Sequence, residues 1–149
     1  MTPPDAIAPD PDISVIISTY NRAAALREAL EALSRQTAPD DAFEVIVVDD
    51  CSSDNTPGVC AEAGRRLPNL RIRRLETNVG IGDAANSGAS LARGSRLLFT
   101  DDDCVPDRDW VANLAAALRD HAVVGGRVRS PTGDYVQWST NVAHFYPFM

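Results

Sequence analysis

The sequence alternates short apolar runs with segments of helical periodicity, and this alternation constrains the fold more than any other feature. Residues 13–18 and 43–48 are compact runs of mainly β-branched residues, as expected for buried strands. Between them, apolar residues of segment 22–36 recur at the spacing of one helix face. Successive strand–helix units connect right-handedly and build a parallel sheet. The sequence therefore predicts an α/β fold with a mostly parallel, Rossmann-like sheet and helices on both faces.

The same alternation continues to about residue 128. We expect helices at 22–36, 56–66, 84–93 and 108–119, and further strands at 70–75, 97–100 and 122–128. Asn21 is the expected cap of the first helix. Residues 70–75 alternate apolar residues with Arg, which is typical of a strand near a sheet edge. Residues 1–12 are rich in Pro and Asp and lack the apolar stretch of a signal peptide, so we expect a flexible lead-in.

Composition narrows the classes of function. A chain of 149 residues is long enough for one domain with its own core. The net charge of -7 argues against a nucleic-acid partner or an anionic membrane surface. All 14 basic residues are Arg, which excludes a lysine Schiff base and a lysine-dependent phosphate loop. No apolar run approaches the ~20 residues that span a bilayer.

The three cysteines point to a compartment. Cys51, Cys60 and Cys104 are odd in number and lack the paired spacing of a metal site. This favours a reducing compartment, in which we expect the thiols to serve as small apolar or near-site residues. Together with the absence of a signal peptide and of a membrane span, this predicts a cytoplasmic protein.

The acidic triplet Asp101-Asp102-Asp103 directly follows the expected strand 97–100. Three adjacent carboxylates repel one another, and folding does not require them at a strand end. Hard cations such as Mg²⁺ are held by one or two carboxylates, with substrate phosphates completing the shell. Open α/β sheets bind ligands at the carboxyl ends of their strands. The triplet suggests a metal–diphosphate site, although an acidic turn with a helix cap explains it equally well.

Two other strand ends carry polar residues. Segment 18–22, Ser-Thr-Tyr-Asn-Arg, opens a helix whose free N–H groups and Arg22 could face an anion, with Tyr20 flanking a base. Segment 49–56 begins with two acids, and an Asp at a strand end can bind a base or ribose. A capped helix start and a polar loop are the ordinary alternatives. The glycines of segment 78–88 do not form G-x-G-x-x-G, so they are weak evidence for a phosphate loop.

Four segments in register resemble family 2 glycosyltransferases, which have the GT-A fold. They are VIISTYNR at 15–22, VVDDCSSDNT at 47–56, NVG at 78–80 and FTDDD at 99–103. The resemblance covers about residues 13 to 128. It implies a metal-dependent inverting glycosyltransferase that moves a sugar from a nucleotide-diphosphate donor to an unknown acceptor, with Mg²⁺ or Mn²⁺ as cofactor. It also implies a nucleotide-sugar-binding GT-A domain at 13–130 and the start of an acceptor-side region, apparently truncated, at 131–149.

The resemblance assigns roles residue by residue. Asp50 matches the residue that binds the nucleobase, and segment 18–22 matches the lining of the nucleoside pocket. The D-x-D motif of the family maps to Asp101 and Asp103, but three consecutive Asp leave the register open, so Asp102 could replace either neighbour. The nucleotide-binding candidates are Ser18, Thr19, Tyr20, Arg22, Asp50, Ser53, Asp101 and Asp102, and the metal candidates are Asp101 and Asp103.

Two departures from the family pattern matter. Many members carry an Arg where this chain has Ala85, so we expect no charge contact to the donor from that position. The catalytic base of the family is an acid well downstream of D-x-D, whereas Asp134 is the only acid here after Asp120. His121 and His144 fit structural roles better than a catalytic one. The catalytic base is therefore unknown, and we expect it beyond Met149.

Other classes fit the pattern less well. A non-catalytic nucleotide-sugar-binding or interaction module with the same fold would show the same motifs. A phosphoacceptor receiver domain needs an acidic pair after its first strand and a Lys, and this chain has neither. A sugar-phosphate nucleotidyltransferase would show a Gly-rich, basic first loop in place of segment 18–22.

Overall fold

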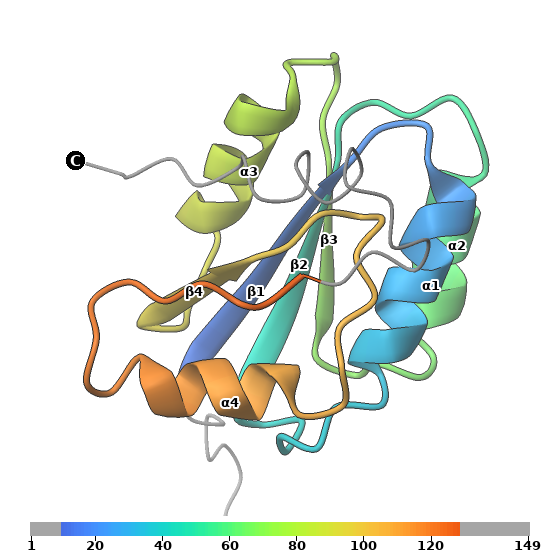
Figure 1. The fold of residues 1–149 in the computed structure, drawn as a ribbon. Coiled ribbons are helices and arrows are strands. Elements are labelled where there is room, and N and C mark those ends of the chain that lie inside the picture. Colours follow the sequence, from blue (N-terminus) through green and yellow to red (C-terminus); the bar gives the residue numbers. More distant parts are fainter. Residues whose placement is uncertain (1–9, 129–149) are drawn as a thin grey trace, which may run out of the picture.

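A computed structural model describes residues 10–128, which form a four-stranded sheet with helices on both faces (Figure 1). The elements in chain order are β1 (Ile13–Thr19), α1 (Ala23–Leu33), β2 (Phe43–Asp49), α2 (Thr56–Ala63), β3 (Leu70–Arg74), α3 (Ile81–Ser90), β4 (Arg96–Phe99) and α4 (Trp110–Ala117). The strand order is β3-β2-β1-β4, and every pair is parallel. This confirms the predicted fold class, with β3 at an edge of the sheet.

The two central strands are buried on both faces. On one face, alternate residues of β1 and β2 pack against α1, α2 and α4 in the main core. Its members include Ile13, Val15, Ile17, Phe43, Val45, Val47, Leu26, Leu30, Val59 and Val111. On the other face, Ile46 and Val48 pack against Ala84 of α3. Burial on both sides explains why these strands read as continuous apolar runs rather than alternating ones.

Helix α3 lies close to the sheet because of a glycine. A Cβ at Gly88 would lie 2.7 Å from Cγ2 of Ile16, so only glycine allows this approach. The chain before the helix is equally specific, since Gly80 has a φ of +91°, a conformation that side chains rarely adopt. These two glycines place α3 and the turn that precedes it.

The order of the strands defines where a ligand can bind. The chain runs outward from β1 through β2 to β3 and then returns to place β4 on the other side of β1. Such a reversal opens a crevice at the carboxyl ends of the two strands on either side of it. In this chain those ends are Thr19 on β1 and the acidic triplet after β4. The topology therefore brings the first and last of the predicted site segments together.

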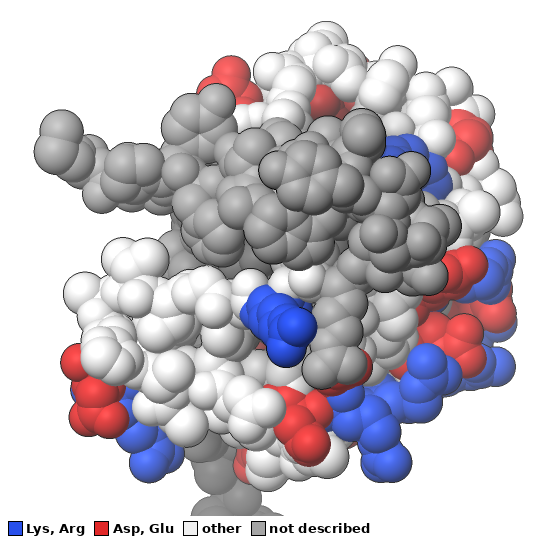
Figure 2. Space-filling view, in the orientation of Figure 1, with Lys and Arg blue, Asp and Glu red and all other residues white. Residues whose placement is uncertain are grey.

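Charged side chains cover the helical side of the molecule. Figure 2 shows acidic and basic residues alternating over the side where α1 and α2 lie. Arg27 of α1 pairs with Glu62 of α2. Arg35, just after α1, pairs with Glu31 of α1 at 2.9 Å. Exposed pairs of this kind contribute little to stability. They mark α1 and α2 as a solvated face of mixed charge, distinct from the acidic triplet.

Two predictions about secondary structure were wrong. Residues 121–128 contain no strand, and Val123 is 82% exposed. The pair Gly125-Gly126 lowers strand propensity, and Gly126 instead lies beside the indole of Trp110. Asn21 does not cap α1 either, because the helix begins at Ala23 with Arg22 at the cap position, and the Arg22 side chain makes no capping hydrogen bond.

The ends of the expected domains fall largely outside the described residues. Of the expected lead-in 1–12, residues 10–12 are described, and the Asp12 N–H donates to the carbonyl of Ala42 at 3.2 Å. The boundary at 130 and the expected acceptor-side segment 131–149 lie beyond residue 128. Within residues 10–128, none of the helices has the length and apolar character needed to cross a membrane.

Candidate functional site

The middle carboxylate of the triplet turns inward. The Thr19 hydroxyl at the end of β1 donates to Oδ2 of Asp102 at 2.7 Å, and Asp102 is only 4% exposed. Burial raises the pKa of Asp102, the Thr19 hydrogen bond and Arg22 oppose that rise, and the neighbouring carboxylates add to it. Asp102 thus joins β1 to the loop after β4. Its burial distinguishes it from its two exposed neighbours in the triplet.

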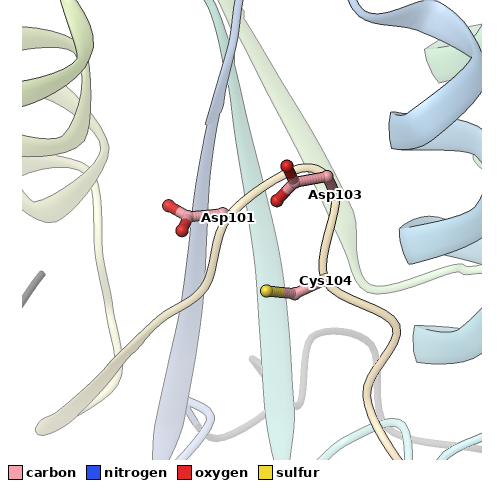
Figure 3. A group of neighbouring side chains, drawn as sticks. All are labelled: Asp101, Asp103 and Cys104. Carbon is pink, nitrogen blue, oxygen red and sulfur yellow. The ribbon is translucent and has the colours of Figure 1, made fainter. Parts of the chain in front are cut away.

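The outer carboxylates come together on the solvent side of the same loop. Asp101 and Asp103 are exposed, and with the half-buried Cys104 they form a group whose potential ligand atoms lie within 4.8 Å of one another (Figure 3). The Cys104 N–H donates to the Asp101 carbonyl at 3.2 Å, which closes the turn. Asp101 and Asp103 are the residues to which the family resemblance maps the metal ligands.

The chemistry of this group fits a hard cation. Carboxylate oxygens are the ligands that Mg²⁺ and Mn²⁺ prefer, whereas a thiol is a softer donor. Burial, together with Asp101 and Asp103, raises the pKa of Cys104, so its thiol stays protonated at neutral pH without a metal. Sequence reasoning did not name Cys104 as part of the site, although its position next to the triplet was a signal.

Arg22 links the first loop to the triplet. Its Nη2 donates to Oδ2 of Asp103 at 2.7 Å, and its Nη1 lies 3.3 Å from Oδ1 of Asp102. The hydrogen bond to Asp103 raises the pKa of Arg22, although partial burial opposes the rise. From the sequence, Arg22 could face an anion or belong to an ordinary helix start. In this structure the anions are side chains of the protein itself.

Asn21 interlocks the loops that follow β1 and β2. Its φ is +53°, and its Oδ1 accepts hydrogen bonds from the N–H of Ser53 at 2.7 Å, the Ser53 hydroxyl at 3.2 Å and the Asp54 N–H at 3.3 Å. Its own N–H donates to the Ser52 hydroxyl at 2.9 Å. Asp54 in turn accepts the N–H of Ala23 at 2.9 Å, which serves the start of α1 in place of the expected Asn21 cap.

Asp50 holds the turn before α3. It is 3% exposed, and its two carboxylate oxygens accept the N–H groups of Val79 at 2.8 Å and Gly80 at 2.9 Å. The Asn78 amide also donates to the Asp50 carbonyl at 3.3 Å. Asp50 therefore connects the second predicted segment to the third. Its predicted contact with a nucleobase stays a prediction.

The neighbouring Asp49 was not predicted as part of this framework. Its Oδ1 accepts the Ser52 N–H at 2.9 Å, and its Oδ2 pairs with Arg74 at 3.2 Å. Arg74 also donates to the Ser52 carbonyl at 2.7 Å. The available signal was the Arg-rich strand at 70–75, although only the structure shows that it pairs with β2. This pair fixes the loop that carries Ser53.

The remaining candidates fall into three groups. Ser18 is partly buried near the end of β1, and Tyr20 is 48% exposed, so its ring is accessible from solvent. Asp134 and His144 lie outside the described residues. His121 is exposed after α4, where its N–H donates to the Ala117 carbonyl at 3.2 Å. Direct contacts thus join Thr19, Arg22 and the triplet, while Ser53 and Asp50 hold the adjoining loops.

Comparison with known proteins gives a family. The model of glycosyl transferase family 2 matches residues 14–148. The poly(ribitol-phosphate) β-N-acetylglucosaminyltransferase TarS of Staphylococcus aureus is 38% identical over 109 residues, which cover 72% of this chain and 19% of TarS. The glycosyltransferase AglE of Haloferax volcanii is 34% identical over 120 residues, covering 79% of this chain and 40% of AglE.

Solved structures agree with this result. The crystal structure of S. aureus TarS 1-349 in complex with UDP matches with a TM-score of 0.70 and 34% identity, covering 80% of this chain and 38% of that one. The mannosyltransferase PcManGT from Pyrobaculum calidifontis, in complex with GDP-Man and Mn²⁺, matches with a TM-score of 0.65 and 32% identity, covering 79% and 35%. The chain thus spans well under half the length of these relatives. With a family model that matches nearly its whole length, the chain belongs to glycosyltransferase family 2.

Proposed function

We propose that this chain binds the donor in a metal-dependent, inverting glycosyltransferase that moves a sugar from a nucleoside diphosphate to an acceptor. One observation carries the proposal: Asp101 and Asp103 converge, exposed, at the carboxyl end of β4 beside β1. This is the point of the sheet where strand order reverses and ligands bind. Complexes of TarS with UDP-GlcNAc and of PcManGT with GDP-Man and Mn²⁺ support a nucleotide-sugar donor.

Asp101 and Asp103 would hold Mg²⁺ or Mn²⁺. Both carboxylates are exposed, and their oxygens are close enough to share one ion. When bound, the ion would supply positive charge to the diphosphate as it departs. Asp102 has a different part, because its hydrogen bond to Thr19 fixes the loop that carries the two ligands. The D-x-D pattern of this chain is then Asp101 and Asp103 with a structural middle residue.

The loops beside the metal ligands would bind the nucleotide. Tyr20 presents an accessible ring on which a base can lie, and Ser18 and Ser53 belong to the adjoining strand end and loop. Asp50 already accepts two N–H groups, but each carboxylate oxygen has a second lone pair that can accept an N–H of a base. The acceptor hydroxyl would lose its proton to a general base, and we assign none among residues 10–128.

Calorimetric titration tests the donor site. UDP, GDP and their sugars are titrated into the chain with and without Mn²⁺, using the wild type, Asp103→Ala and the control Asp41→Ala. Asp41 is exposed in the loop before β2, at the opposite end of the sheet. We expect Mn²⁺-dependent binding of one nucleotide, weakened at least tenfold in Asp103→Ala and unchanged in Asp41→Ala. Folded protein that binds none of these nucleotides would contradict the proposal and favour an interaction module.

Turnover separates an enzyme from a binding module. Incubation of the bound nucleotide sugar with Mn²⁺ should release the nucleoside diphosphate, by transfer or by slow hydrolysis, and Asp103→Ala should release less. Donor binding without any release would favour a non-catalytic nucleotide-sugar-binding module. The cytoplasmic location stays a prediction.

A further inference from the structure

The guanidinium of Arg22 contacts two of the three carboxylates after β4. One nitrogen lies 2.7 Å from Asp103, and the other lies 3.3 Å from Asp102. Arg22 reaches them from the loop between β1 and α1, far away in the sequence. A guanidinium fork that spans two carboxylates supplies a fixed positive charge to this acidic loop.

Asp103 takes part in two arrangements that compete. Its Oδ2 accepts the hydrogen bond from Arg22, and its carboxylate also belongs to the group with Asp101 and Cys104. A divalent cation at that group would meet the positive charge of Arg22 on the same carboxylate. Like charges a few ångströms apart repel each other even in a watery environment. The cation and the guanidinium therefore cannot both use Asp103 at full strength.

The two carboxylates that Arg22 contacts differ in their distance from the guanidinium and in their exposure. Asp103 is 48% exposed in its side chain, whereas Asp102 is 5% exposed and fixed by Thr19. The Arg22 side chain is itself 50% exposed, so it has room to move. If Arg22 leaves Asp103, its contact with Asp102 keeps the guanidinium at the site. Arg22 can thus pivot on Asp102 rather than depart.

We propose that Arg22 is a positioning residue that regulates the metal site: it holds Asp103 in the metal-free protein and must release it when a divalent cation binds. Arg22 therefore lowers the affinity of the donor-free protein for the cation. The negative phosphates of a donor offset the repulsion between the two positive groups, so cation and donor bind together. This inference rests on the proposed function, because it takes Asp101 and Asp103 as the ligands of the cation.

Binding of Mn²⁺ without nucleotide tests the inference. Electron paramagnetic resonance of the free ion gives the affinity of the wild type, Arg22→Gln, Arg22→Lys and the control Arg27→Gln. Arg27 lies one turn further along, in α1, and pairs with Glu62 away from the triplet. We expect Arg22→Gln to bind Mn²⁺ about fivefold more tightly, since an exposed ion pair is worth up to ~1 kcal/mol. Arg22→Lys keeps the charge and should stay near wild type, as should Arg27→Gln.

A second measurement uses the unaltered chain. In a titration with Mg²⁺, the side-chain Nε–H resonance of Arg22 in a ¹H–¹⁵N spectrum should shift as the guanidinium leaves Asp103. The Nε–H resonance of Arg27 should not shift. This readout holds even if Arg22→Gln proves too unstable to study, which thermal unfolding followed by circular dichroism will show.

The outcomes separate this inference from the proposed function. Mn²⁺ binding that is lost in Asp103→Ala but equal or weaker in Arg22→Gln would overturn the role of Arg22 and leave the metal site intact. A saturating Mg²⁺ titration that leaves the Arg22 resonance unmoved would do the same. Folded wild type and Arg22→Gln that both fail to bind Mn²⁺ or Mg²⁺ would contradict the metal site itself, and the inference with it.

Discussion

Each end of the sheet contains a buried carboxylate that accepts a hydrogen bond from a hydroxyl of β1. The two carboxylates differ in the other partners that surround them. At the amino end, Glu44 of β2 accepts the Ser14 hydroxyl at 2.7 Å. At the carboxyl end, Asp102 accepts the Thr19 hydroxyl, also at 2.7 Å. Ser14 and Thr19 are five residues apart, roughly 17 Å along the strand. The same elementary contact thus occurs at both ends of one strand.

The amino end is saturated with partners. Glu44 also accepts Nη1 of Arg71 at 2.8 Å, the Arg93 N–H at 2.7 Å and Nε of Arg93 at 3.2 Å. Burial alone would raise the pKa of Glu44, but the hydrogen bonds from Arg71, Arg93 and Ser14 outweigh it and lower the pKa to about 2. A charge held in this way stays ionised and ties β1, β2, β3 and the turn before β4 together.

The carboxyl end is left incomplete. Asp102 accepts one hydrogen bond, from the Thr19 hydroxyl, and makes one longer contact with Arg22. Its neighbours Asp101 and Asp103 are carboxylates too. Burial is therefore not outweighed, and the pKa of Asp102 lies above its ordinary value. The comparison shows that at the amino end, where the network only stabilises the fold, arginines balance the buried carboxylate. Where a ligand is proposed to bind, the fold leaves negative charge for a cation to neutralise.

Removing the saturated carboxylate should have the largest effect on stability. Glu44→Ala removes the buried acceptor of the Ser14 hydroxyl and of the Arg93 N–H, and it breaks the ion pairs with Arg71 and Arg93. We expect a loss of about 3–5 kcal/mol in the free energy of unfolding. Urea denaturation measures it. The control Glu31→Ala breaks an exposed pair with Arg35 and should cost less than about 0.5 kcal/mol. A loss below about 1 kcal/mol for Glu44→Ala would mean that the amino end is not stabilised by this network.

The pH dependence of stability should follow Glu44. Its pKa is about 2 in the folded chain against an ordinary value of 4.5, so its ionised form stabilises the fold above about pH 5. This contribution, up to about 3 kcal/mol at 1.36 kcal/mol per pKa unit, is lost as pH falls from 5 towards 2. The raised pKa of Asp102 changes stability in the opposite direction, because protonation at lower pH removes the cost of burying its charge.

Unfolding free energies measured between pH 2 and pH 7 check this prediction. The wild type should lose stability steeply below pH 5, and Glu44→Gln should show a shallower slope because it cannot be protonated. Equal slopes in the two proteins would show that Glu44 is not the group that titrates.

Loss of the hydroxyl at the other end should have a smaller effect. Thr19→Val removes a hydrogen bond to the buried carboxyl group of Asp102 and should cost about 2 kcal/mol in unfolding free energy. Thr37→Val is the matched control, because the Thr37 hydroxyl makes a 2.8 Å hydrogen bond to Asp109 in an exposed setting. We expect about 0.5 kcal/mol or less there. Equal losses in the two variants would indicate that Asp102 is not held by Thr19.

The central strands could be predicted because local composition decides them. Phe43–Asp49 and Ile13–Thr19 extend the predicted strands by one residue each, since runs of buried β-branched residues have few alternatives. Helix α3 begins at Ile81, three residues earlier than predicted. Its glycines suggest a loop, but the Asp50 carboxylate fixes Val79 and Gly80 and allows the helix to start at once. A contact between distant segments overrides the local preference here.

The candidate site shows the same limit. Adjacency places Asp101 and Asp103 at a strand end, but three identical residues do not reveal which one turns inward. That depends on Thr19, which lies beside the triplet only because β4 pairs with β1. The partners of Arg22 follow from the same long-range pairing. The predicted strand at 122–128 was wrong for the converse reason. This run is apolar, but in the described part of the chain no neighbouring strand pairs with it.

The most direct test of the difference between the two ends is paramagnetic broadening by Mn²⁺. Substoichiometric Mn²⁺ is added to ¹⁵N-labelled protein, and the loss of amide signal is mapped along the sequence. The amide signals of Thr19, Arg22, Asp101 and Asp103 should broaden first, while those of Glu44, Arg71 and Arg93 stay sharp. Broadening centred on Glu44, or spread evenly over exposed acids such as Asp41, would contradict a cation site at the carboxyl end of β4.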